Sequence, residues 1–129
     1  MNADIQRDVL DRLASRVTGC AHTVSNTLGT GFLEKVYENA LQVEMLHVGI
    51  RTSQQATFAV RYRGEIVGTY VPDLIAEDSV IIEIKATARL DPVHRVQCMN
   101  YLRTTGLSVA LLMNFGLPRL DIQRVVHNF

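Results

Sequence analysis

The sequence predicts a mixed α/β protein in which helices flank a mixed β-sheet. Three observations predict this class: a helical spacing of apolar residues over the first 45 positions, strand-like patterns between residues 58 and 86, and a further helical segment between two apolar strands near the C-terminus. The 129 residues, 47% of them hydrophobic, suffice for one domain, residues 1–129, that buries a core without a disulfide or a metal.

Two consecutive helices are expected to open the chain. Apolar residues recur at steps of three and four over residues 5–28, which is typical of an amphipathic helix. Gly29-Thr30-Gly31 ends this helix, and the glycine at 31 is expected to serve the backbone conformation there. A similar spacing over residues 33–45 predicts a second helix, with Gly49 just beyond its end.

The pattern then changes to that of strands. Residues 58–62 alternate, a short turn follows, and residues 66–71 form a second strand that Pro72 ends, so a hairpin is expected. Residues 80–86 are β-branched on both faces, which predicts a central strand covered from both sides. An antiparallel pairing of the strand over 66–71 with this central strand is one arrangement that the sequence allows.

A third helix and two more strands complete the prediction. Asp91 and Pro92 predict a helix start, as an N-cap acid followed by a proline at the first helical position, and Gly106 ends that helix. Residues 107–113 form another apolar strand, and residues 120–126 can form a last edge strand. The predicted order is α-α-β-β-β-α-β-β.

The charge balance excludes several classes of protein. Thirteen Lys and Arg residues match 13 Asp and Glu residues, so the net charge of zero argues against a protein that holds nucleic acid by bulk charge. The charge is uneven, because residues 1–50 carry four basic and six acidic side chains, whereas residues 86–129 carry five and two. The spacing of Cys20 and Cys98 argues against a structural zinc site. No apolar run is long enough for a membrane span, and a cytoplasmic protein is therefore expected.

Two charged residues interrupt the predicted central strand. Glu83 and Lys85 are two positions apart, so both side chains point to the same face. Burying an ion without a partner is costly, and an ion pair between the two is the simplest structural explanation.

Asp73 offers a second, chemical explanation. If the strand over 66–71 pairs antiparallel with the central strand, its carboxylate comes near that of Glu83, and the repulsion between them raises one pKa. A divalent cation removes this conflict. Oxygen ligands that leave room for waters, with the Ile84 carbonyl as a further ligand, suit Mg²⁺ or Mn²⁺. Lys85 beside such a metal can orient or help deprotonate the attacking water and stabilise charge on a phosphate, which suits phosphodiester hydrolysis.

Three motifs carry a resemblance to a known superfamily. Pro72-Asp73, nine residues, and Glu83-Ile84-Lys85 resemble the signature of the PD-(D/E)XK nuclease superfamily. Gly31-Phe32-Leu33-Glu34-Lys35-Val36-Tyr37 resembles the GxxExxY pattern of a small prokaryotic family within it. Gln97-Cys98-Met99-Asn100-Tyr101 resembles the QxxxY motif of exonuclease and helicase-nuclease branches. The resemblance runs from about residue 29 to residue 113 and implies an α-β-β-β-α-β core.

The resemblance also implies roles for single residues. Asp73 and Glu83 match the metal-binding acids, and Lys85 matches the catalytic lysine. Glu34 resembles a helical glutamate that reaches the metal or its waters in some branches, although a first-turn helix acid is the simpler alternative.

On the third helix, Gln97 and Tyr101 lie one turn apart and resemble residues that position the lysine or contact substrate phosphate. The alternative is that they share no role. His94, Cys98 and Cys20 are expected to be structural, and Tyr37 is expected to be a core aromatic.

A nuclease must also hold its polyanionic substrate. Four side chains on the third helix and its flanks could form a basic edge for phosphates: Arg89, His94, Arg95 and Arg103. The leading hypothesis is a Mg²⁺- or Mn²⁺-dependent nuclease acting on DNA. A homodimer, or a complex with a partner protein, is an additional option that the sequence leaves open. The alternatives are a non-catalytic module on a nuclease-like fold that binds nucleic acid or protein, and an interaction protein with no role on nucleic acid.

Overall fold

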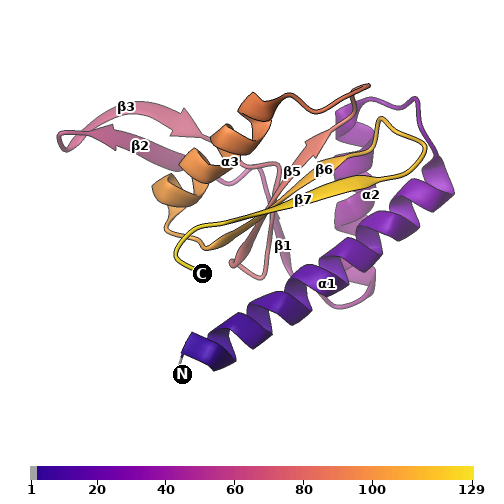
Figure 1. Ribbon diagram of the computed structural model, residues 1–129, viewed down its shortest axis with the longest axis horizontal. Helices are drawn as coiled ribbons and strands as arrows, with labels where there is room; N and C mark the ends of the chain where they lie inside the picture. The colour runs from indigo at the N-terminus through magenta and orange to yellow at the C-terminus, as the bar shows by residue number, and fades with distance from the viewer. Residues whose placement is uncertain (1–2) are drawn as a thin grey trace.

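A computed structural model describes residues 3–129 and places a five-stranded sheet between helices (Figure 1). Helices α1 (Ala3–Leu28) and α2 (Glu34–His47) pack on one face of the sheet, and α3 (Pro92–Thr105) packs on the other. The core therefore has two layers, one on each side of the central strands. None of the helices within the described residues is long and apolar enough to cross a membrane.

The sheet has the strand order β1-β4-β5-β6-β7. Its strands are β1 (Thr52–Gln54), β4 (Leu74–Ala76), β5 (Val80–Lys85), β6 (Val109–Asn114) and β7 (Asp121–Val126). Strands β5 and β6 are parallel and α3 connects them, whereas the other neighbours are antiparallel. Burial of β5 and β6 on both faces confirms the prediction of a central apolar strand.

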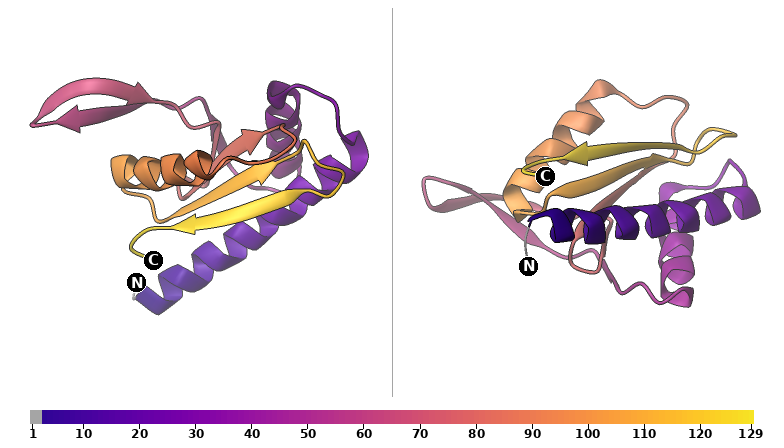
Figure 2. Two further views of the ribbon diagram at one scale, coloured as in Figure 1. Left: turned by 45° about the horizontal axis from the view of Figure 1, so that its top comes forward. Right: turned by 60° about the horizontal axis from the view of Figure 1, so that its bottom comes forward.

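Two further strands, β2 (Phe58–Tyr62) and β3 (Glu65–Tyr70), form a separate hairpin. The hairpin reaches outward past α3 and away from the five-stranded sheet (Figures 1 and 2). The predicted hairpin is thus confirmed, but β3 does not pair with the central strand β5, the arrangement considered from the sequence.

The strand that pairs with β5 is β4, which follows Pro72. Proline donates no backbone hydrogen bond and ends β3, so the chain turns there and starts a new strand. Strands β1 and β4 have three residues each, too few to produce a recognisable period, and the observed order is α-α-β-β-β-β-β-α-β-β.

The helix boundaries follow the predicted signals. At the start of α3, the Val93 N–H donates to the Asp91 side chain across 3.0 Å, and Gly106 ends the helix with φ 78°. The predicted apolar stripe of α1 is buried only from about Leu13 onward. Ile5 and Val9 are 48% and 45% exposed, because the first turns extend past the sheet (Figure 2).

Candidate active site

Two acidic side chains meet where β4 begins and β5 ends. The last β4–β5 pair joins Leu74 to Ile82, so Asp73 lies opposite Glu83 one position further on. The Ile84 N–H donates to Asp73 Oδ2 across 2.8 Å. Because the N–H and C=O of one strand residue point to the same side, the Ile84 carbonyl faces the same edge as Asp73.

The two carboxylates are held in a poorly hydrated place. Glu83 is 8% exposed, and burial, with the neighbouring charge of Asp73, raises its pKa to about 7. Burial also raises the pKa of Asp73, although the hydrogen bond from the Ile84 N–H acts in the opposite direction. The pair therefore favours a proton or a cation at neutral pH.

Lys85 completes this group without pairing to either acid. It is half-buried at the end of β5, and within residues 3–129 its amino group makes no hydrogen bond and no ion pair. Its charge nevertheless acts to lower the pKa of Asp73 and of Glu83. The simple structural explanation, a Glu83–Lys85 ion pair, is thus wrong, and the ammonium group is available beside the acids.

Tyr70 is a site residue that the sequence analysis missed. Its hydroxyl donates to Glu83 Oε1 across 2.5 Å, and its ring stacks on that of Tyr101 with the centroids 3.5 Å apart. Tyr101 therefore reaches the acids through Tyr70, whereas Gln97, one turn earlier, is exposed. The sequence feature that could have identified Tyr70 is its position as an aromatic residue at the end of a predicted strand, three residues before Asp73.

Helix α2 brings two more carboxylates near Asp73. Glu34 is the first residue of the helix and is exposed, while Glu38, one turn later, is 4% exposed. After burial, the charges of Glu38 and Glu34 are among the causes that raise the pKa of Asp73. Glu38 Oε2 accepts hydrogen bonds from Lys35 Nζ at 3.0 Å, Gln54 Nε2 at 2.6 Å and Gln55 Nε2 at 2.9 Å. The spacing of four between the two glutamates was the signal that could have found Glu38.

Tyr37 positions the start of α2. It is fully buried, its hydroxyl donates to the Gly29 carbonyl across 2.6 Å, and its ring stacks on Phe115 with the centroids 4.8 Å apart. Gly31 adopts φ 106°, which a residue with a side chain rarely adopts. These contacts fix the loop that leads to Glu34 and agree with the core role expected for the tyrosine.

The four side chains predicted to contact phosphate lie along α3 and its approach. Arg89 and Arg103 are exposed towards its two ends. His94 accepts the backbone N–H of Asp91 as part of a capping box, and Arg95 donates to a backbone carbonyl of β7. None of the four is among the main influences on the pKa of Asp73 or Glu83, so the structure does not gather them at the acids.

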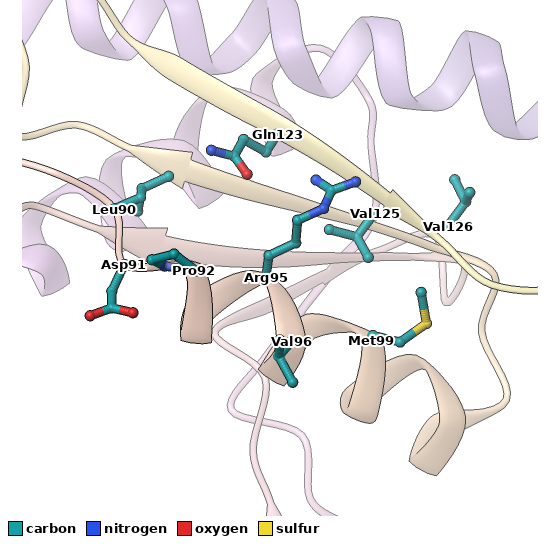
Figure 3. Close-up of a pocket in the computed structure, with 9 residues that line it drawn as sticks. All are labelled: Leu90, Asp91, Pro92, Arg95, Val96, Met99, Gln123, Val125 and Val126. Atoms are coloured by element: carbon teal, nitrogen blue, oxygen red, sulfur yellow. The ribbon is translucent and has the colours of Figure 1, made fainter.

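Arg95 extends across a hollow between α3 and β7 (Figure 3). The hollow has a volume of about 630 Å³ and a largely apolar lining. Asp73, Glu83 and Lys85 do not line it, so this hollow is separate from the acidic group. Cys98, by contrast, is buried beneath α3 near Glu83, where burial raises the pKa of its thiol, in agreement with the structural role expected for it.

The sheet edge that carries Asp73 and Glu83, at the start of β4 and the end of β5, is called the acidic edge below. Its donor atoms fit a hard divalent cation. Asp73 Oδ1 accepts no hydrogen bond from the described part of the chain, while the Glu83 carboxylate accepts one from the Tyr70 hydroxyl and one from the Asp73 N–H. Because each carboxylate oxygen has two lone pairs, both side chains can still bind a cation. With the Ile84 carbonyl they form an oxygen set that suits Mg²⁺ or Mn²⁺, which retain several waters. Residues 3–129 contain no preformed group of three or more His, Cys, Asp or Glu residues for a metal.

Comparisons with known proteins agree with this architecture. The sequence model of the PD-(D/E)XK nuclease superfamily matches residues 11–125. No curated protein matches the chain. The crystal structure of SSO0001 is similar with a TM-score of 0.55 at 16% identity, over 74% of this chain and 50% of that chain. An alkaline exonuclease (LHK-Exo) from Laribacter hongkongensis is similar with a TM-score of 0.53 at 15% identity, over 73% of this chain and 56% of that one. The chain thus spans about half the length of these two structures, which share its fold.

Proposed function

Because the chain belongs to the PD-(D/E)XK nuclease superfamily, we propose that it is a Mg²⁺- or Mn²⁺-dependent nuclease that hydrolyses phosphodiester bonds of DNA. Residues 1–129 would form a single nuclease-like domain of the GxxExxY type, on the motif of Gly31, Glu34 and Tyr37. One observation carries the proposal: the buried carboxylate of Glu83 and the half-buried carboxylate of Asp73 share a sheet edge with Lys85, whose amino group makes no ion pair within residues 3–129.

Each residue at the edge has a distinct role in this proposal. Asp73, Glu83 and the Ile84 carbonyl would hold the metal, which supplies positive charge to the phosphate and lowers the pKa of a bound water. Lys85 would orient the attacking water and stabilise the negative charge that develops on the phosphate. Glu34 lies close enough to influence Asp73 and would act on the waters around the metal.

The α3 residues would act at greater distance. Tyr101 stacks on Tyr70, which holds the Glu83 carboxylate, so it would position an acid rather than touch the phosphate. Gln97 is exposed one turn before Tyr101 and is free to contact substrate. The arginines along α3 would bind phosphates outside the catalytic edge.

The test is cleavage of DNA by the purified chain in Mg²⁺ or Mn²⁺. We expect cutting by the native protein and its loss in Asp73→Asn and in Lys85→Ala, measured on linear and circular DNA. Asp78→Asn is the matched control, because Asp78 is an exposed turn residue at the other end of β5 and has a left-handed φ that asparagine tolerates. Metal-dependent cutting that survives in both site variants would refute the assigned residues.

A non-catalytic binding module is the second candidate. It is favoured by the absence, within residues 3–129, of a preformed group of three metal-binding side chains. Titration calorimetry separates the two functions. Mg²⁺ or Mn²⁺ binding that disappears in Asp73→Asn supports the nuclease, while DNA affinity without such metal binding supports the module.

A further inference from the structure

The β2–β3 hairpin, residues 58–70, forms an arm that projects from the molecule (Figures 1 and 2). Its strands pair with each other and with no strand of the main sheet. Phe58 and Val60 pack at its base against the α3 side of the core. Beyond this base both faces of the arm are open to solvent.

The free part of the arm exposes large apolar side chains. Tyr62, Ile66 and Val67 are 65%, 60% and 61% exposed. A two-stranded hairpin is marginally stable by itself, and a cluster of exposed apolar side chains on such an element indicates a surface that is covered in use.

The charges around the arm indicate a polyanion as its occupant. Arg61 and Arg63 are exposed on the arm, and Glu65 is the single acidic residue of the hairpin. Arg103 of α3 and Arg61 line the same hollow, of about 440 Å³, together with Ala59, Val60 and Thr104. No acidic side chain lines this hollow, so guanidinium groups dominate it.

We propose that the arm is a DNA-binding element that enters the major groove of a B-form duplex, with Arg61, Arg63 and Arg103 on the phosphates. The major groove of B-DNA accommodates a two-stranded β-ribbon, and apolar side chains can contact thymine methyl groups there. The major groove of A-form RNA is deep and too narrow for side chains to read, so the shape of the arm favours DNA. This inference rests on the proposed nuclease function. It goes further by naming the part of the chain that would hold the duplex.

The arm is attached directly beside the acidic edge. β3 ends at Tyr70, whose hydroxyl donates to Glu83. Six residues separate Tyr70 from Gly64 at the tip, which corresponds to roughly 20 Å of extended strand. At about 3.4 Å per base pair, the arm then grips the duplex within about six base pairs of the phosphate at the acids.

The first experiment measures duplex binding as a function of salt. Fluorescence anisotropy is recorded in Mg²⁺ on a 24-base-pair DNA, with Lys85→Ala as the background in order to prevent cleavage. We expect Arg61→Ala/Arg63→Ala to lower the slope of log K against log salt by about 2 and to weaken binding at least tenfold at 0.1 M salt, since about one counterion is released per phosphate contact. The matched control is Arg12→Ala/Arg119→Ala, two exposed arginines on α1 and in the β6–β7 loop.

Failure of this inference differs from failure of the proposed function. In the chain that retains Lys85, hydrolysis of the small diester bis(4-nitrophenyl) phosphate should be unchanged by the arm substitutions, because that substrate cannot span arm and acids. An unchanged salt slope, or equal affinity for an RNA duplex of the same sequence, would overturn the arm as a DNA element while leaving the nuclease intact. No hydrolysis of either substrate by the native chain would instead overturn the nuclease.

A second copy of the chain is the competing occupant of the arm. Sedimentation at increasing protein concentration tests it, with Tyr62→Ser/Val67→Ser as the variant. A monomer that binds DNA supports the proposal. A dimer that dissociates in this variant, with no change in DNA affinity, would assign the arm to self-association and overturn it.

Discussion

At the scale of single residues, Glu83 links the site to the stability of the fold. Burial and the charge of Asp73 raise its pKa to about 7 from an ordinary value of 4.5. Between those two pH values the folded chain binds more protons than the unfolded chain, so the free energy of unfolding falls as pH rises through this window. In metal-free protein the loss is nearly complete about one pH unit above this pKa of about 7, and Asp73 contributes with the same sign because its pKa is also raised.

We therefore predict that Glu83→Gln stabilises the metal-free chain at pH 8 and weakens its pH dependence between pH 5 and pH 8. The gain should be of the order of 3 kcal/mol, since the pKa rises from 4.5 to about 7 and one pKa unit corresponds to about 1.4 kcal/mol. Urea unfolding in EDTA at the two pH values measures it. The control variant Glu65→Gln, at an exposed position, should behave like the native chain. If Glu83→Gln kept the pH dependence of the native chain, the Glu83 carboxylate would not be the source of that dependence.

The sequence could identify a site residue where its position depends only on the spacing along one strand. The two-residue step from Glu83 to Lys85 places both on one face of a strand regardless of the fold around them. Tyr70 was not predictable in this way, because its contact with Glu83 depends on the direction the chain takes after Pro72. The proximity of Asp73 to Glu83 was expected for a wrong strand pairing, and the short strand β4 supplies the contact instead.

At the scale of elements, the β6–β7 turn packs directly on the segment that follows β5. Buried Asn114 accepts the Thr87 N–H at 3.1 Å and the Gly116 N–H at 2.9 Å, and it donates to the Thr87 carbonyl at 3.0 Å. A Cβ on Gly116 would lie 2.3 Å from both the Thr87 nitrogen and the Thr87 oxygen. Because these are backbone atoms, the segment after Lys85 would have to move.

Gly116→Ala is therefore predicted to lower the free energy of unfolding by about 1–3 kcal/mol, the usual cost of overpacking, and to lower the proposed nuclease activity by displacing Lys85. Gly19→Ala is the control with opposite sign. Gly19 lies in α1 with open space around it, so alanine should stabilise the helix by about 0.5–1 kcal/mol. Denaturant unfolding of both variants checks this, and a neutral Gly116→Ala would exclude the turn as a support for the lysine.

Elements were predictable in proportion to their length. Helices α1 and α3 extend over enough residues for the period and the end signals to be recognised, as with Asp91 and Gly106. Strands β1 and β4 have only three residues each, so no pattern separates them from a loop. The hairpin was recognisable from alternation and its turn, but alternation says nothing about which sheet it joins.

At the scale of the whole molecule, the net charge of zero conceals two separated groups of opposite sign. The acids gather where α2, β4 and β5 meet, as Glu34, Glu38, Asp73 and Glu83. The exposed arginines Arg61, Arg63 and Arg103 lie on the arm and on α3. A polyanion is therefore attracted by one part of the surface and repelled by the group of acids, and a divalent cation bound there would remove the repulsion.

Because the folded chain holds Asp73 and Glu83 close together, we also predict that a bound metal ion stabilises the fold. A cation that binds the folded chain alone stabilises it by about 2.7 kcal/mol at a concentration of one hundred times Kd, because the unfolded chain does not hold Asp73 and Glu83 together. For a chain of this size the melting temperature should rise by roughly 5–10 °C. The rise should be larger at pH 8 than at pH 5, since protons compete with the cation at Glu83, whose pKa is about 7. Scanning calorimetry in Mn²⁺ and in EDTA measures it: Asp73→Asn should abolish the rise and Asp78→Asn should retain it. A rise of equal size in both variants would mean that the cation acts elsewhere on the surface.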